Sequence, residues 1–239
     1  MEHLRERLDE LLSSYSGQKD LREQLEGLVS IHPFNEQEFI IAHLLAADVI
    51  VLKEYLRIRQ DYIDRNPYLD LFEKGPTAFG STWAEGLVKQ LVPDLVLPTR
   101  ATDPDSRQYD FVLDTKIRVE VKASRAVDGS SSEPLIIKAL ASDSTKRFDM
   151  NFQQLKPRYC DVFVWVAVWR DVIRYWVMTS KEVESHKDFS KGQHKGNTGE
   201  GQLHITDRNI RSFDGFLTAS DKLGDAIRTA YERQMKKKA

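Results

Sequence analysis

The sequence has little of several features that point to other classes of protein. It holds one cysteine, Cys160, which excludes an internal disulfide and a thiolate-rich zinc site. Its most apolar stretch, 39–52, is too short to span a bilayer and contains His43 and Asp48. The charged, amphipathic beginning of the chain is unlike a signal peptide. We therefore expect a cytoplasmic protein that does not act in a membrane.

A strong charge of one sign is also missing, since the formal net charge of the 239 residues is −2. This small value conceals an asymmetry, because residues 1–75 carry a net charge of −6 and residues 76–239 a net charge of +4. With 41% hydrophobic and 30% charged residues, the composition is that of a globular protein. The basic excess permits a polyanionic partner without requiring one.

Two regions differ in their periodicity. Leucines at helical spacing predict one or two amphipathic helices over residues 2–30, and a long helix is expected over 36–65. Beyond them, short apolar strands and helices follow one another. The sequence therefore predicts a helical extension over 1–75 and a core domain over 76–239. The extension would serve as a buttress, a dimerisation surface or a DNA clasp.

The core domain is expected to be of the α/β class. Its first helix opens at Thr82 and ends before Pro93. The continuous apolar run 161–168 predicts a strand covered on both faces. In chain order, the other expected elements are strands at 95–97, 109–113 and 117–124, a helix at 143–156, a strand at 172–178, a loop at 184–202 and a helix at 220–235.

Charged residues lie within two of these apolar strands, and three of them, Asp110, Glu120 and Lys122, form the candidate site. A three-residue connection, 114–116, would place Asp110 opposite Glu120, on the same face and with Cβ atoms about 5 Å apart. Alternation along a strand then puts Lys122 on the face of Glu120. A two-residue connection would instead turn Asp110 to the other face. The length of the turn therefore decides whether these side chains meet.

Two carboxylates this close repel each other unless a cation lies between them. Oxygen ligands of this kind favour Mg²⁺, with Mn²⁺ as a possible substitute, over zinc. Such a cation activates water and a phosphoryl group, and Lys122 would hold or help deprotonate the nucleophile. The alternative is a solvated hairpin face with a cross-strand Glu–Lys pair. The apolar character of both strands favours the metal site.

Asp110, the run Glu120-Val121-Lys122 and the order helix, three strands, helix, strand over 82–168 resemble the PD-(D/E)xK nuclease superfamily. The resemblance implies a restriction-endonuclease-like core, a central mixed sheet flanked by helices in the order αβββαβ. It also implies metal ligation by Asp110, Glu120 and the Val121 carbonyl, and cleavage that leaves a 5′-phosphate. Tyr109 stands where many members have proline.

Other residues are weaker candidates for this site. Glu85 lies where many similar nucleases carry an acid that reaches the metal through water, but Thr82-x-x-Glu85 is also a helix-capping box. Side chains that flank the proposed centre are candidate DNA contacts. They are Arg125, Lys146, Arg147, Gln154 and Lys195.

These observations together predict a magnesium-dependent DNA endonuclease, most simply a type II enzyme of a restriction system. The chain shows no helicase, ATPase or zinc module, and its helical extension suits a homodimer that cuts both strands of palindromic double-stranded DNA. One alternative is a structure-specific repair or junction nuclease. Another is a nucleic-acid-binding protein that keeps the fold without the activity.

Overall fold

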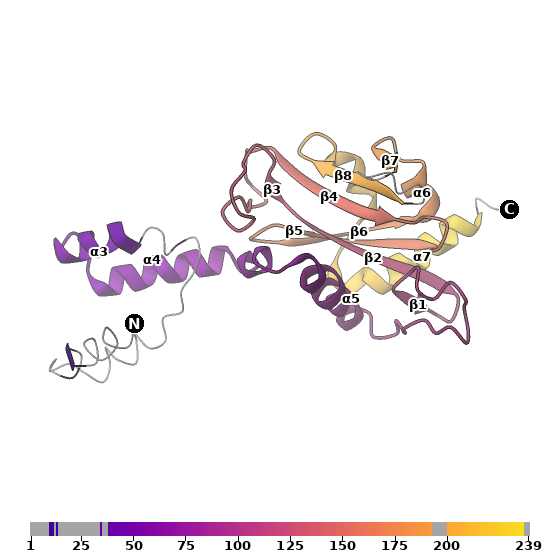
Figure 1. Ribbon diagram of the computed structural model, residues 1–239, viewed down its shortest axis with the longest axis horizontal. Coiled ribbons are helices and arrows are strands. Elements are labelled where there is room, and N and C mark those ends of the chain that lie inside the picture. The colour runs from indigo at the N-terminus through magenta and orange to yellow at the C-terminus, as the bar shows by residue number, and fades with distance from the viewer. Residues whose placement is uncertain (1–9, 12, 14–33, 35–37, 193–199, 237–239) are drawn as a thin grey trace. The chain divides into compact units, whose positions relative to one another are not determined.

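The computed structural model describes residues 10, 11, 13, 34, 38–192 and 200–236 (Figure 1). The chain forms two compact units, Met1–Arg59 and Gln60–Ala239. Among the described residues, no helix is long and apolar enough to cross a membrane.

The N-terminal region contains α3 (Glu38–Ala46) and the start of α4 (Leu52–Arg65). The single helix predicted over 36–65 is wrong, because the chain leaves helical geometry at Asp48, whose φ is 55°. The helices predicted over 2–30 lie outside the described residues, apart from 10, 11 and 13.

The second unit is built on sheet A, whose strand order is β1-β2-β5-β6-β9. β2 and β5 are parallel and the other pairs are antiparallel, so the sheet is mixed. The predicted strands at 161–168 and 172–178 are confirmed, and they pair with each other. The strands are β1 (Phe111–Leu113), β2 (Ile117–Arg125), β5 (Val162–Val168), β6 (Ile173–Thr179) and β9 (Leu217–Thr218).

The β1–β2 hairpin has the predicted register, with Val112 opposite Arg118 and Leu113 opposite Ile117. Its turn is possible because Asp114 and Thr115 both adopt positive φ, 50° and 59°. Two successive residues of this kind give a turn whose twist matches that of the flanking strands. The three-residue connection thus fixes which residue of the first strand lies opposite each residue of β2.

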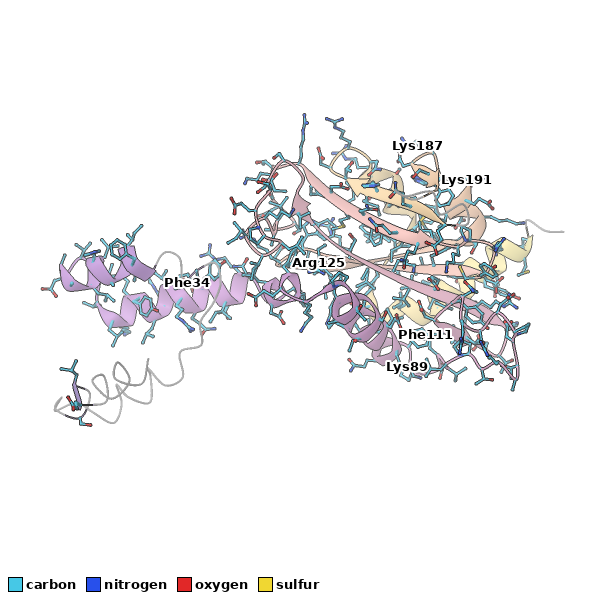
Figure 2. All side chains as sticks on the ribbon, in the orientation of Figure 1. Phe34, Lys89, Phe111, Arg125, Lys187 and Lys191 are labelled. Carbon is cyan, nitrogen blue, oxygen red and sulfur yellow. The ribbon has the colours of Figure 1, made fainter. Side chains whose placement is uncertain are left out.

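Sheet A separates two apolar layers. On one face, Val119 and Val121 pack in a core with residues of α5 (Glu85–Leu91) and α7 (Leu223–Lys236). On the other face, Trp165 of β5 packs against β4 (Phe148–Leu155). Figure 2 draws the described side chains on the ribbon, with Phe111 of β1 and Arg125 of β2 labelled. Since Glu120 and Lys122 alternate with the core valines, they extend on the β4 side of β2.

Sheet B has the order β3-β4-β8-β7. The helix predicted over 143–156 is wrong, since most of that segment is β4, antiparallel to β8. The loop predicted over 184–202 is also partly wrong, because it contains β7 and the first residues of β8. The remaining strands are β3 (Val127–Asp128), β7 (Phe189–Lys191) and β8 (Gly201–Thr206).

Short helices connect and cover these sheets. The predicted C-terminal helix is confirmed as η5 followed by α7. Residues Leu69, Leu71 and Phe72, which precede the predicted core boundary at 76, pack in the core of the second unit. The short helices are η2 (Leu69–Phe72), η3 (Ala78–Ala84), α6 (Ser180–Glu184), η4 (Ile210–Phe216) and η5 (Ser220–Lys222).

The fold is therefore mixed α/β, with a mixed sheet flanked by helices. The order αβββαβ is not found. The segment predicted as the first strand makes only one bridge, Val96 to Val112, and the described residues 126–161 contain no helix between β2 and β5. β4 of sheet B occupies the place in the chain where that helix was expected.

Candidate active site

A polar cleft of about 850 Å³ lies along the outer edge of β2, between the helical segment 76–85 and β4. β1 pairs only with Ile117–Val119, so no described strand covers this edge from Glu120 to Arg125. The charged side chains that line the cleft are balanced in number. They are Arg107, Lys122, Arg125 and Lys156, and Glu85, Asp110, Glu120 and Asp149.

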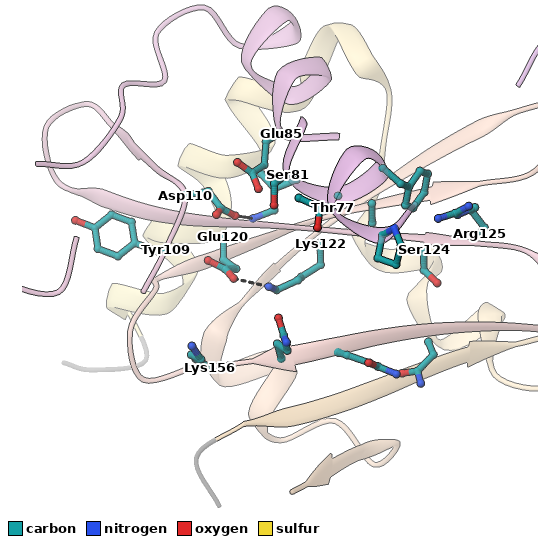
Figure 3. A pocket seen from close by; sticks show the side chains of 18 of the residues that line it. Thr77, Ser81, Glu85, Tyr109, Asp110, Glu120, Lys122, Ser124, Arg125 and Lys156 are labelled. Carbon is teal, nitrogen blue, oxygen red and sulfur yellow. Dashed lines mark hydrogen bonds and ion pairs between the residues drawn. The ribbon is translucent and has the colours of Figure 1, made fainter. Parts of the chain in front are cut away.

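Asp110 is held at this edge by two hydrogen bonds. Its backbone N–H donates to the Val119 carbonyl at 3.1 Å, and its Oδ2 accepts the N–H of Val121 at 2.7 Å. The preceding Tyr109 is anchored as well, since its hydroxyl donates to Oδ2 of Asp103 at 2.7 Å. These contacts fix the start of β1, and the Asp110 carboxyl therefore lies beside β2 and close to Glu120 (Figure 3).

Glu120 and Lys122 form a partly buried ion pair in the cleft, with Nζ 2.7 Å from Oε1 (Figure 3). Glu120 is only 6% exposed. Its other oxygen, Oε2, is buried without a hydrogen-bond partner among the described residues. An unpaired buried polar group costs about 1–3 kcal/mol, and more when charged. A bound cation would remove that cost.

Burial and mutual repulsion disfavour the ionised carboxylates. Burial, together with repulsion from Asp110, raises the pKa of Glu120 to about 7, although attraction to Lys122 lowers it. Burial also raises the pKa of Asp110, although the Val121 N–H opposes this shift. Burial alone would lower the pKa of Lys122, but the contact with Glu120 outweighs burial and raises it. Lys122 therefore remains an ammonium group at neutral pH.

Glu85 also belongs to the cleft. The helix begins before Thr82, because η3 runs into α5, and neither η3 nor α5 has a side-chain cap. The capping-box interpretation of Glu85 is therefore wrong. Burial, followed by repulsion from Asp110, raises the pKa of Glu85 to about 7, while a hydrogen bond with Ser81 lowers it. Figure 3 shows Glu85 extending from the helix toward Asp110.

The candidate DNA contacts occupy different places. Gln154 lines the cleft. Arg125 also lines it, but its Nη1 donates to the carbonyls of Leu71 and Phe72 at 3.1 Å, which holds η2 against β2.

The other three candidates do not line the described cleft. Lys146 pairs with Asp128 at 3.0 Å. Arg147 is exposed on the turn before β4. Lys195 lies outside the described residues.

Several cleft residues were not among the predicted site residues. Asp149, Asn151 and Gln153 alternate with apolar residues along β4, a period-two pattern typical of a strand. That pattern was available in the sequence. Arg107 and Gln108 reach the cleft because they precede the anchored Tyr109, which no local pattern indicates.

The described residues contain no group of three histidine, cysteine or acidic side chains that could hold a metal ion. The predicted ligand set is of another kind, two carboxylates with a backbone carbonyl. The unpartnered Oε2 of Glu120 fits that set.

Comparison with known protein families and with curated proteins finds no family and no curated protein that matches the chain.

Proposed function

We propose that this protein is a magnesium-dependent DNA endonuclease that acts through the cleft beside β2. The observation that carries the proposal is the buried Oε2 of Glu120. This oxygen has no partner among the described residues, although it lies in a cleft that also holds Asp110, Lys122 and Glu85. Such a concentration of buried and half-buried carboxyls is unfavourable in itself, and a divalent cation explains it most simply.

The cation would be held by the carboxylates of Asp110 and Glu120 and by the carbonyl of Val121. The N–H and C=O of a strand residue leave on the same side of the strand. Because the N–H of Val121 meets Asp110 at the outer edge, its carbonyl also faces that edge. All three ligands are oxygens, the donor type that magnesium prefers.

The remaining groups have separate roles. Magnesium, when bound, supplies a Lewis acid that polarises the phosphoryl group. The Lys122 ammonium has three N–H donors, of which one meets Glu120. The others would orient the attacking water and offset the negative charge that develops on phosphorus. Lys122 would thus hold the water in position beside the phosphoryl group.

Double-stranded DNA is the substrate that we propose. The lining side chains carry equal numbers of acidic and basic groups, so a bound divalent cation would make the cleft favourable for a polyanion. We further propose site-specific cleavage by a homodimer, in the manner of type II restriction enzymes, since a two-fold dimer presents one site to each strand of a palindromic sequence.

The test is incubation of the purified protein with plasmid DNA in Mg²⁺, in Mn²⁺ and with chelator. We expect discrete, metal-dependent fragments with 5′-phosphate ends that ligase can join. Glu120→Gln and Lys122→Ala should abolish cleavage, whereas the exposed control Glu133→Gln should not. No cleavage of any DNA with either metal, or full activity of Glu120→Gln, would reject the proposal. Cleavage of branched DNA alone would indicate a junction nuclease.

A further inference from the structure

We propose that β4 is the strand that reads DNA sequence, with Asn151, Gln153 and Gln154 contacting base edges and preferring adenine. This inference rests on the proposed function and deepens it by naming the residues that set specificity. It is carried by an irregularity in β4 and by the chemistry of the three amides.

The irregularity is a β-bulge. Phe152 pairs with Leu203 and Leu155 pairs with Gly201, so Gln153 and Gln154 together oppose the single residue Gln202. Gln154 has φ 56°, a conformation that residues other than glycine seldom adopt. Bulges of this kind occur beside active sites, where they redirect side chains.

The bulge changes which side chains reach the cleft. Successive residues of a regular strand point to opposite faces, but here Gln153 and Gln154 are both exposed and both line the cleft. Neither side chain hydrogen-bonds to another described residue. Asn151, two positions earlier, also lines the cleft, and its Oδ1 is buried without a partner in the described part of the chain. Three amides are thus collected along one wall.

Their chemistry indicates bases as the ligand, and not phosphate. Amides are neutral, so they add little to the attraction of the backbone, which arginine and lysine supply. An asparagine or glutamine amide matches the N6 and N7 groups of adenine at the base edges of the major groove. β4 pairs with β8 within sheet B, and its amides share the cleft with Glu120 and Lys122. Reading and cutting would then occur on one duplex.

The experiment is selection from a randomised duplex library, scored by sequencing both the bound molecules and the cut ends. We expect a preferred sequence that contains adenine. Gln153→Ala, Gln154→Ala and Asn151→Ala should each reduce the preference at particular adenine positions, on the order of tenfold to a hundredfold. The matched control is Gln90→Ala, an exposed glutamine on α5 outside the cleft lining.

The outcomes separate this inference from the proposed function. If the protein cuts DNA but all three variants keep the wild-type preference, or if the preferred sequence lacks A·T pairs, the proposal that β4 reads the sequence is rejected. The proposal of nuclease activity is then retained. If the protein binds selectively without cutting and the variants alter that selection, the proposal that β4 reads the sequence is supported and the proposal of nuclease activity is rejected. If the protein neither binds nor cuts the library, both are overturned.

Discussion

The backbone N–H of Val121 donates to Oδ2 of Asp110 at 2.7 Å, which ties the first acid of the site to the strand that carries the second. Asp110 precedes β1, and its backbone N–H donates to the Val119 carbonyl. Without this bond, its carboxyl would depend on the short strand that follows. The bond therefore fixes the position of the Asp110 carboxyl, although the strand that follows has only three residues. It leaves the other oxygen of Asp110 available to a ligand.

Divalent cations should stabilise the folded protein. A ligand that binds only the native state adds about 2.7 kcal/mol at a hundred times its dissociation constant. For a protein of this size, that amounts to an increase of roughly 5–10 °C in the unfolding midpoint. Thermal unfolding in chelator and in Mg²⁺ would measure it. The variant Glu120→Gln should lose most of the increase, and an equal increase in that variant would show that Glu120 does not hold the cation.

Glu85→Gln should stabilise the protein at high pH in the absence of cations. The ordinary pKa of the Glu85 carboxyl, 4.5, is raised to about 7 in the folded state, by burial first and by Asp110 second. The unfolded chain thus loses its proton first, and stability falls as pH rises from about 4.5 to 7. Because the group is half exposed, we expect a gain of only about 1 kcal/mol in the variant at pH 8.

The same substitution should have no effect near pH 4, where the carboxyl is protonated in both states. Chemical unfolding in chelator at the two pH values gives the comparison, with the exposed Glu133→Gln as control. A gain of the same size at both pH values would contradict the electrostatic origin of the effect.

Arg228 should stabilise the hairpin that carries the site. Its Nε and Nη2 donate to the two carboxylate oxygens of Asp114 at 2.8 and 3.1 Å, joining α7 to the turn between β1 and β2. The pair is solvent-exposed, so Arg228→Ala should cost about 1 kcal/mol or less. Arg228→Lys keeps the charge but cannot donate two parallel hydrogen bonds to one carboxylate, so it should recover only part of the lost stability. Equal stability of the lysine variant and the wild type would show that the bidentate geometry is unimportant.

The register of the β1–β2 hairpin could be predicted because it depends on residues that are close together in the sequence. Asp114-Thr115-Lys116 sets the register, and alternation then assigns Glu120 and Lys122 to one face. The cleft could not be predicted in the same way. Its opposite wall comes from β4, whose position depends on pairing with β8 some fifty residues later. Glu85 was ambiguous for a related reason, since its role depends on where the helix begins.

The error at β4 has a specific cause. Phe148, Phe152 and Leu155 are spaced by four and three residues, which is the pattern of one helical face. Met150 does not fit that face, but it fits a strand, and it is fully buried. The bulge at Gln153 and Gln154 shifts Leu155 by one position and returns it to the core. A bulge in a strand can therefore give the apolar residues the sequence spacing that is typical of a helix.

An alanine scan of β4 should distinguish these two structures in solution. Phe152 is 1% exposed and meets the ring of Trp165 edge-to-face, with centroids 4.7 Å apart. Phe152→Ala should therefore cost about 3–5 kcal/mol through the cavity that it leaves. Met150→Ala should cost about 2–5 kcal/mol, whereas Gln153→Ala should change stability by less than about 0.5 kcal/mol. Chemical unfolding of the three variants measures these differences.

A helix with Phe148, Phe152 and Leu155 on its buried face would leave Met150 on the opposite side, so a neutral Met150→Ala would contradict the strand. A strand requires that Met150 and Phe152 both be costly, because only a period of two places them on the same face.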